Sequence, residues 1–141
     1  MKLILLFLFL TSGLAHAQDT LVVERFSSSL YLGESLHFGN RSIKFKKLIS
    51  DSRCPRNVTC IWAGEAEVLV EVYQEGKPFG TKLLTIAAGE KPLSFLQEFF
   101  PDEEIALNSL LLTPYPERPG GIDPEAYSLD LEVQVTRKIS Q

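Results

Sequence analysis

With 141 residues, the chain is long enough for one globular domain and too short for two sizeable ones. Its 14 Lys and Arg against 18 Asp and Glu give a net charge of -4, which offers no electrostatic support for nucleic-acid binding. Two cysteines and two histidines are too few for a typical zinc site, so we expect no metal and no cofactor.

The N-terminus has the three parts of a secretory signal peptide. Lys2 provides the positive charge, Leu3 to Leu10 form an apolar run, and Ala15-His16-Ala17 is a small-residue cleavage site. The run is shorter than the about 20 residues needed to span a bilayer. We therefore expect removal of residues 1–17 and export of residues 18–141 as a single domain, periplasmic or extracellular, without a transmembrane anchor.

Alternation of apolar and polar residues dominates the rest of the chain and is typical of half-buried β-strands. The strand predicted after residue 30 has a kink at Gly33-Glu34, and the broken alternation at Lys46-Lys47 predicts a β-bulge in the next strand. The pattern favours an all-β fold, a single antiparallel β-sandwich of about seven strands, Ig-like or of the Greek-key type. In chain order, the predicted strands lie at residues 20–26, 30–38, from 43 onward, 67–73, 81–87, 105–113 and 127–137.

Turn-forming residues separate several of these strands, at Gly39-Asn40, at residues 75–78 and at Gly89-Glu90. One short helix is predicted at Pro92–Phe100, because prolines limit it at both ends. Its phenylalanines favour a segment that covers an open end of the sandwich over a helix that binds a partner.

The two cysteines, Cys54 and Cys60, enclose five residues and are expected to enter an oxidising compartment, which predicts a structural disulfide. By loop entropy, so small a ring stabilises the fold by about 2 to 2.5 kcal/mol, so the bond shapes the loop as much as it holds the domain. Redox catalysis usually uses Cys-x-x-Cys spacing, which this pair lacks.

The residues around the ring have two interpretations. The carboxylate of Asp51 can accept backbone N–H groups of the following turn while Arg53 clamps it, which is a structural role. Alternatively, Arg53 and Arg56 on a constrained loop form a binding site for an anion or carboxylate. Trp62 is a further candidate binding residue, which we expect to pack under the loop, and Gly64 allows the bend into the next strand.

A proline-rich segment, residues 113–124, separates the last two predicted strands and is longer than a hairpin connection requires. It is either a binding loop, with Tyr115 and Arg118 as candidate contact residues, or a crossover between the two sheets of a Greek key. No local feature decides between these interpretations.

The sequence Asp-Ser-Arg-Cys-Pro at residues 51–55, a second cysteine after four more residues, and Trp-Ala-Gly-x-Ala-x-Val at residues 62–68 form one motif. The motif resembles that of a group of small, uncharacterised bacterial secreted proteins and lipoproteins, and the similarity covers mainly residues 30–72. Several of those proteins carry a lipid-attachment cysteine where this chain has Gln18. The resemblance implies an exported bacterial β domain and supplies no activity and no catalytic residues.

Features of enzymes are scarce in the sequence. Outside the signal peptide, His37 is the only histidine, it falls on the polar face of its strand, and no Gly-x-Ser-x-Gly nucleophile elbow is present. The acid cluster at residues 102–104 is typical of a solvated turn rather than of a calcium site.

We therefore expect no catalytic residues, and the first hypothesis is an exported binding or structural module for an unknown protein or cell-envelope partner. One alternative is a secreted proteinase inhibitor, because a rigid loop can dock in a protease cleft. The other is a small secreted hydrolase, because paired carboxylates are a spatial feature that the sequence does not reveal.

Overall fold

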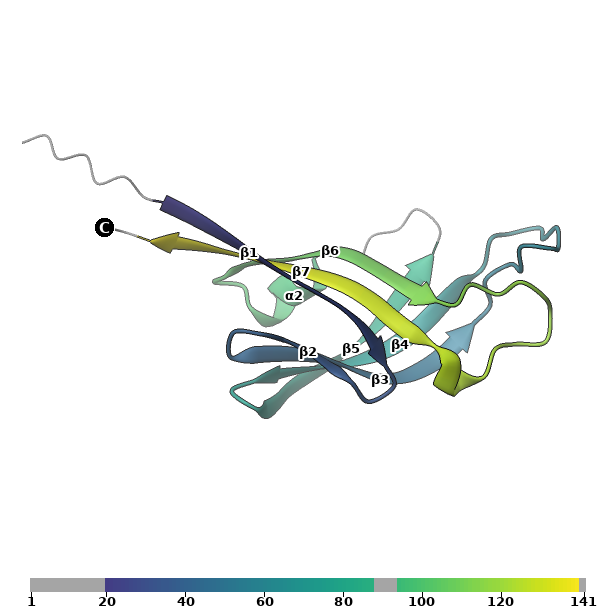
Figure 1. Cartoon of the computed structure of the whole chain (residues 1–141), viewed down its shortest axis with the longest axis horizontal. Coiled ribbons are helices and arrows are strands. Elements are labelled where there is room, and N and C mark those ends of the chain that lie inside the picture. Colours follow the sequence, from purple (N-terminus) through teal and green to yellow (C-terminus); the bar gives the residue numbers. More distant parts are fainter. Residues whose placement is uncertain (1–19, 88–93, 140–141) are drawn as a thin grey trace, which may run out of the picture.

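The computed structural model describes residues 20–87 and 94–139, which form two antiparallel sheets packed face to face (Figure 1). This arrangement confirms the predicted seven-stranded β-sandwich. The signal peptide and the Gly89-Glu90 turn lie outside the described residues. One sheet has the order β1 (Thr20–Tyr31), β7 (Ser128–Ile139), β6 (Glu104–Thr113). The other has the order β2 (Ser35–Phe38), β3 (Arg41–Asp51), β4 (Glu65–Gln74), β5 (Lys77–Ala87).

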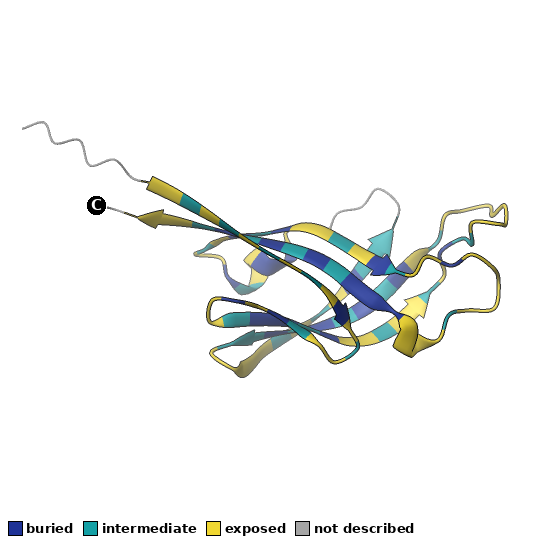
Figure 2. Ribbon diagram, viewed as in Figure 1, coloured by how far each residue is buried: buried dark blue, intermediate teal, exposed yellow. Residues whose placement is uncertain are grey.

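The core lies between the sheets and is built from alternate residues of each strand. In β4, the alternate residues from Ala66 to Val72 are fully buried, while those between them are half-buried. Figure 2 shows the same alternation along β7, whose buried apolar residues are Leu129, Leu131, Val133 and Val135. The alternation that predicted these two strands is therefore confirmed.

The prediction of one kinked strand over residues 30–38 is wrong. β1 ends at Tyr31 in one sheet, and β2 begins at Ser35 in the other. Between them Glu34 turns the chain, because its backbone N–H donates to the carbonyl of Tyr31 and its carboxylate accepts the N–H of Tyr31, both at 2.9 Å. Gly33, at a φ of +87°, completes the turn. The alternation runs through the break because both strands face the same core.

The predicted irregularity in β3 and two of the predicted turns, at Gly39-Asn40 and at Glu75-Gly76, are present. The register of β3 against β4 shifts between Phe45 and Lys47, which confirms the bulge, and shifts again at Leu48/Ser50. Glu75 and Gly76 join β4 to β5 with φ values of +52° and +74°, as a tight two-residue hairpin turn requires. A proline near the start of β5 is tolerated because β5 is an edge strand.

The short helix α2 (Phe95–Phe99) is smaller than the predicted segment, whose first residues lie outside the described ranges. It contacts β5 and β6, the two strands at one side of the sandwich. Phe95, Leu96 and the following Phe100 are buried in the core. The predicted covering role is therefore confirmed.

Two loops gather at one end of the sandwich, the end opposite Thr20 and Ile139 (Figure 1). The first, here called the disulfide loop, is residues 52–64 between β3 and β4. The second is the proline-rich segment, which ends in the short 3-10 helix η1 (Pro124–Ala126). Because β6 and β7 are neighbours in one sheet, this segment is not a crossover between sheets, and that interpretation is wrong.

Candidate functional site

The disulfide loop extends the β3–β4 hairpin beyond its strands. The N–H of Ser52 donates to the carbonyl of Glu65, and the N–H of Cys54 donates to that of Ala63, both at 2.8 Å. Beyond these bonds, the Cys54–Cys60 disulfide closes the ring, with the two Cα atoms 6.0 Å apart. The predicted disulfide is therefore confirmed. Within the ring, the N–H of Val58 donates to the carbonyl of Pro55 at 3.1 Å and forms a tight turn.

Gly64 occupies a position that only glycine fits. Its φ is +68°, in the left-handed region that other residues rarely adopt. A Cβ added there would also overlap the carbonyl of Ser52, at the other end of the disulfide loop. The close approach of these two backbones therefore depends on the absence of a side chain at residue 64.

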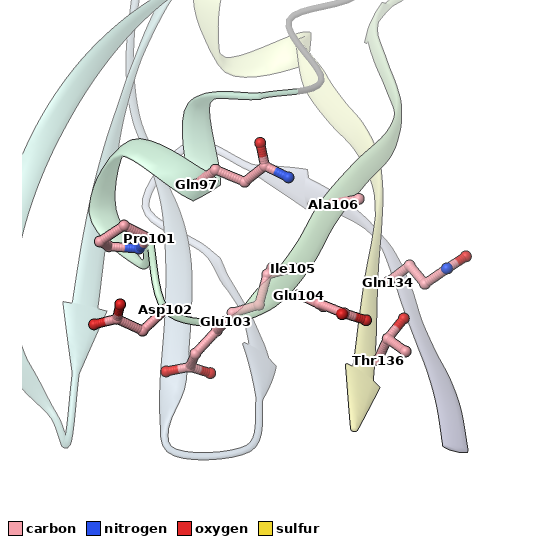
Figure 3. A pocket seen from close by; sticks show the side chains of 9 residues that line it. All are labelled: Gln97, Pro101, Asp102, Glu103, Glu104, Ile105, Ala106, Gln134 and Thr136. Atoms are coloured by element: carbon pink, nitrogen blue, oxygen red, sulfur yellow. The ribbon is translucent and has the colours of Figure 1, made fainter. Parts of the chain in front are cut away.

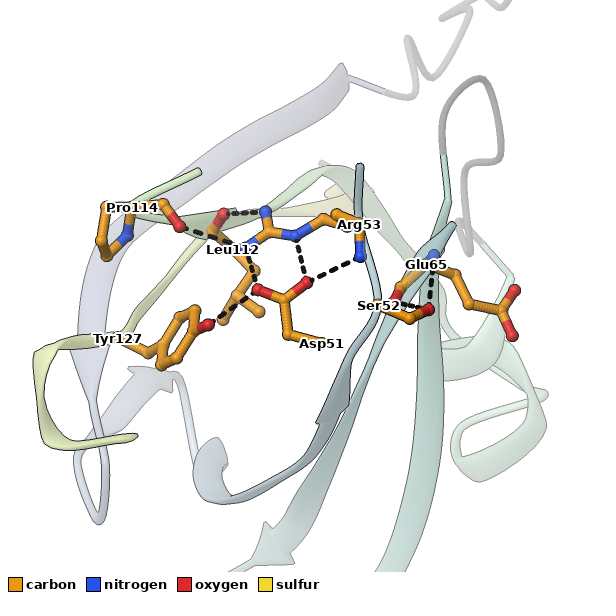
Figure 4. A network of polar contacts seen from close by, with 7 residues as sticks. All are labelled: Asp51, Ser52, Arg53, Glu65, Leu112, Pro114 and Tyr127. Atoms are coloured by element: carbon orange, nitrogen blue, oxygen red, sulfur yellow. Dashed lines mark hydrogen bonds and ion pairs between the residues drawn. The ribbon is translucent and has the colours of Figure 1, made fainter. Parts of the chain in front are cut away.

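Asp51, at the end of β3, is the centre of a buried network of polar contacts (Figure 4). Arg53 donates two hydrogen bonds to the carboxylate of Asp51, from Nε at 2.8 Å and from Nη2 at 2.7 Å. The backbone N–H of Arg53 donates to the same carboxylate at 3.2 Å, and the hydroxyl of Tyr127 donates to it at 2.7 Å. Both charged side chains are only 7% exposed. This is the clamp that the structural interpretation of Asp51 and Arg53 describes.

The same arginine reaches across to the other sheet. Its Nη1 donates to the carbonyl of Leu112 at 2.6 Å, and its Nη2 donates to that of Pro114 at 3.1 Å. Leu112 is near the end of β6, and Pro114 begins the proline-rich segment. The guanidinium of Arg53 is therefore used to fasten the two sheets and both loops together, and it is not displayed at the surface.

Burial and hydrogen bonding shift the pKa values of Asp51 and Tyr127. Burial raises the pKa of the Asp51 carboxyl, but hydrogen bonds from Arg53 and Tyr127 outweigh it and hold this pKa below its usual value. Burial, followed by the hydrogen bond to Asp51, raises the pKa of the Tyr127 hydroxyl to about 12. At neutral pH the network is therefore a carboxylate bound by a guanidinium and a neutral phenol.

Among the other candidate residues, Arg56 and Tyr115 lie together. The guanidinium carbon of Arg56 is 5.4 Å from the centre of the Tyr115 ring, and that of Arg53 is 4.9 Å from it. The loops also join through their backbones, because the N–H of Arg56 donates to the carbonyl of Pro116 at 3.0 Å. Arg118 lines a second hollow within the proline-rich segment, and Tyr115 lines that hollow as well.

The expectation that Trp62 packs under the loop is wrong, because 79% of this residue is exposed. Its neighbour Ile61 is 98% exposed, and Val58, inside the ring, is 42% exposed. The buried side chain of this loop is instead that of Arg53, whose guanidinium lies over the Tyr115 ring and donates to the carbonyl of Leu112. The apolar side chains of the disulfide loop therefore point into solvent.

The acid cluster at residues 102–104 borders a hollow of about 550 Å³ at the side formed by α2, β6 and β7 (Figure 3). Glu103 forms an ion pair with Arg41. Figure 3 shows Asp102 and Glu104 pointing to different sides. No group of three His, Cys, Asp or Glu residues suited to a metal ion occurs within residues 20–87 and 94–139, and His37 is exposed.

No protein-family model, no curated protein and no solved structure matches the chain. In the part of the chain that the structure describes, no helix is long and apolar enough to cross a bilayer.

Proposed function

We propose that this protein is an exported, non-enzymatic binding module whose disulfide loop contacts a protein or another component of the cell envelope. The observation that carries the proposal is the exposure of Ile61 and Trp62, at 98% and 79%, side by side on one loop. The secretory signal of the sequence supports the compartment.

Tryptophan is among the residues that contribute most to protein interfaces, because one side chain offers a large rigid surface and a single N–H donor. Here the indole lies next to an isoleucine that is almost fully exposed, so a partner can cover both at once. Burying one large apolar side chain contributes about 1.5 to 3 kcal/mol. Two adjacent residues of this kind are a suitable central contact.

The loop is held in one conformation before any partner arrives. The disulfide closes its ring, the Arg53 clamp fixes its first residues, and the Arg56 N–H ties it to Pro116. Ordering a mobile loop on binding weakens affinity by about 0.5 to 1.5 kcal/mol for each immobilised side chain. A loop that is already ordered avoids most of this loss.

The chain has a single tryptophan, so its intrinsic fluorescence reports on residue 62 alone. The mature protein is titrated separately with phospholipid vesicles, cell-wall fragments and detergent-solubilised envelope proteins. We expect one of these fractions to shift the emission to shorter wavelength and to protect the indole from a soluble quencher. We also expect Trp62→Ala and Ile61→Ser to abolish retention on that fraction with an unchanged melting temperature.

The matched control is Leu21→Ser, because Leu21 is 57% exposed and lies in β1 at the opposite end of the sandwich. This variant should be retained like the wild type. Retention with no change in Trp62 emission, or equal retention of the Trp62→Ala variant, would place the contact elsewhere and contradict the proposal.

A further inference from the structure

We propose that the pocket between the disulfide loop and the ends of β5 and β6 binds a small amphipathic carboxylate, with Arg56 at the carboxylate and the apolar wall around the hydrocarbon. The pocket lies behind the loop and includes neither Ile61 nor Trp62. The proposal is therefore independent of the partner contact proposed above.

The volume of the pocket is about 330 Å³. Small-molecule pockets range from about 300 to 1,000 Å³, so this one suits a ligand at the small end of that range. Four segments meet there, namely the disulfide loop, the end of β5, the end of β6 and the start of the proline-rich segment. The apolar residues of its wall are Ala63, Ile86, Ala87, Leu111 and Leu112.

The charge of the pocket is positive. Its charged lining residues are Arg53 and Arg56, and no carboxylate lines it among the described residues. Asp51 neutralises Arg53 through two hydrogen bonds. Arg56 has no ion pair in the described ranges, and its guanidinium has only the ring of Tyr115 as a partner there. The positive charge of Arg56, which no carboxylate neutralises among the described residues, lies beside an apolar wall. Such a pocket is complementary to a monoanion with a hydrocarbon chain.

The shape of the guanidinium favours a carboxylate. Its N–H groups form a planar fork that matches the two oxygens of a carboxylate, and such charge-assisted bonds are about twice as strong as neutral ones. The ring of Tyr115 holds the guanidinium at the mouth of the pocket, since their centres are 5.4 Å apart. Arg56 therefore needs little rearrangement to accept the ligand.

The test compares three probes of equal chain length, octanoate, 1-octanol and octylamine, by calorimetry and by amide chemical-shift mapping on the mature protein. We expect octanoate to bind roughly tenfold more tightly than octanol, because it adds a charge-assisted contact. Octylamine should bind most weakly. The shifted amides should be those of Ala63, Gly64 and Ala87.

Two variants separate the parts of the site. Arg56→Gln should remove the preference for octanoate over octanol, while Arg56→Lys should keep part of it. Ala87→Phe should weaken both probes by filling the pocket. The proposal is overturned if octanol matches octanoate in the wild type, if Arg56→Gln keeps the preference, or if the shifts map elsewhere.

One further variant separates this proposal from the first. Trp62→Ala should bind octanoate like the wild type even where it loses retention on the envelope fraction. Loss of octanoate binding in this variant would show that the probe sits on the exposed loop and would overturn the pocket assignment.

Discussion

The hydroxyl of Tyr127 donates a 2.7 Å hydrogen bond to the carboxylate of Asp51, 76 positions earlier in the chain. Asp51 ends β3 in one sheet, and Tyr127 immediately precedes β7 in the other. The bond therefore fastens the two sheets at the end where the loops gather. Four predictions concern this end of the molecule.

Tyr127 makes the stability of the fold sensitive to alkaline pH. The pKa of its hydroxyl rises from 10.0 to about 12 on folding, so the neutral phenol is favoured in the folded state. Its stabilisation is complete below about pH 10 and is lost as the pH rises through about 12. We expect Tyr127→Phe to be about 1 to 3 kcal/mol less stable at pH 7 and to show a smaller alkaline decline, measured by urea unfolding at a series of pH values.

The control for this experiment is Tyr31→Phe, because Tyr31 is 54% exposed. It should follow the wild type at every pH. An alkaline decline of the same size in Tyr127→Phe and the wild type would show that this phenol is not the titrating group.

Arg53 should be important for stability, because its removal leaves the buried carboxylate of Asp51 without its cation and two carbonyls without a donor. Breaking a buried ion pair in this way costs about 3 to 5 kcal/mol. We expect Arg53→Ala to reach that range in denaturant unfolding. Lys46→Ala, at a residue that pairs with Glu71 and has 45% of its side chain exposed, should lose less than about 1 kcal/mol. Similar losses in both variants would contradict the structural role of the clamp.

Part of this network could be predicted from the sequence and part could not. Asp51 and Arg53 are two positions apart, so their contact follows from local turn chemistry. The partner Tyr127 comes from a distant strand, and nothing in its own neighbourhood specifies a buried carboxylate. The one available signal was the position of Tyr127, directly before a strand whose first residues are buried. A tyrosine in such a position is itself buried, and its hydroxyl then needs a hydrogen-bond partner.

The alternation of apolar residues gave the buried faces of the strands, but it does not report which sheet a strand joins. For that reason the pattern continued across the break between β1 and β2, whose strands share one core. The exposure of Trp62 had no local signal either. Whether an indole packs under a loop depends on contacts with distant parts of the chain, and here the buried side chain of the loop is that of Arg53.

Gly64 should not tolerate a methyl group. Gly64→Ala adds both the strain of a positive φ and an overlap with the Ser52 carbonyl, and we expect a loss of about 3 kcal/mol or more. Gly76→Ala is the matched control, because its φ is +74° and no atom lies within 4 Å of the added Cβ. It should lose about 1 to 2 kcal/mol by thermal or denaturant unfolding. Equal losses would mean that the backbones near Ser52 separate easily.

Removal of the disulfide should weaken the domain without unfolding it. A ring closed by residues 54 and 60 contributes about 2 to 2.5 kcal/mol by loop entropy. We expect the double variant Cys54→Ser and Cys60→Ser to lose that amount in urea unfolding, because the Arg53 clamp and the backbone bonds of Cys54 and Arg56 remain. Complete unfolding at room temperature would show that the ring, and not the clamp, holds this end together.

The pairing of β1 with β7 brings Thr20 opposite Ile139, so the first and last described strands lie next to each other in the sheet. A circular permutant is therefore geometrically simple: a short flexible linker joins these two positions, and new ends open at the exposed Glu75-Gly76 turn. The linker and the new ends then adjoin strands, and neither interrupts the disulfide loop or the proline-rich segment. Such a permuted chain should keep the disulfide loop and the proline-rich segment intact while its folding order changes.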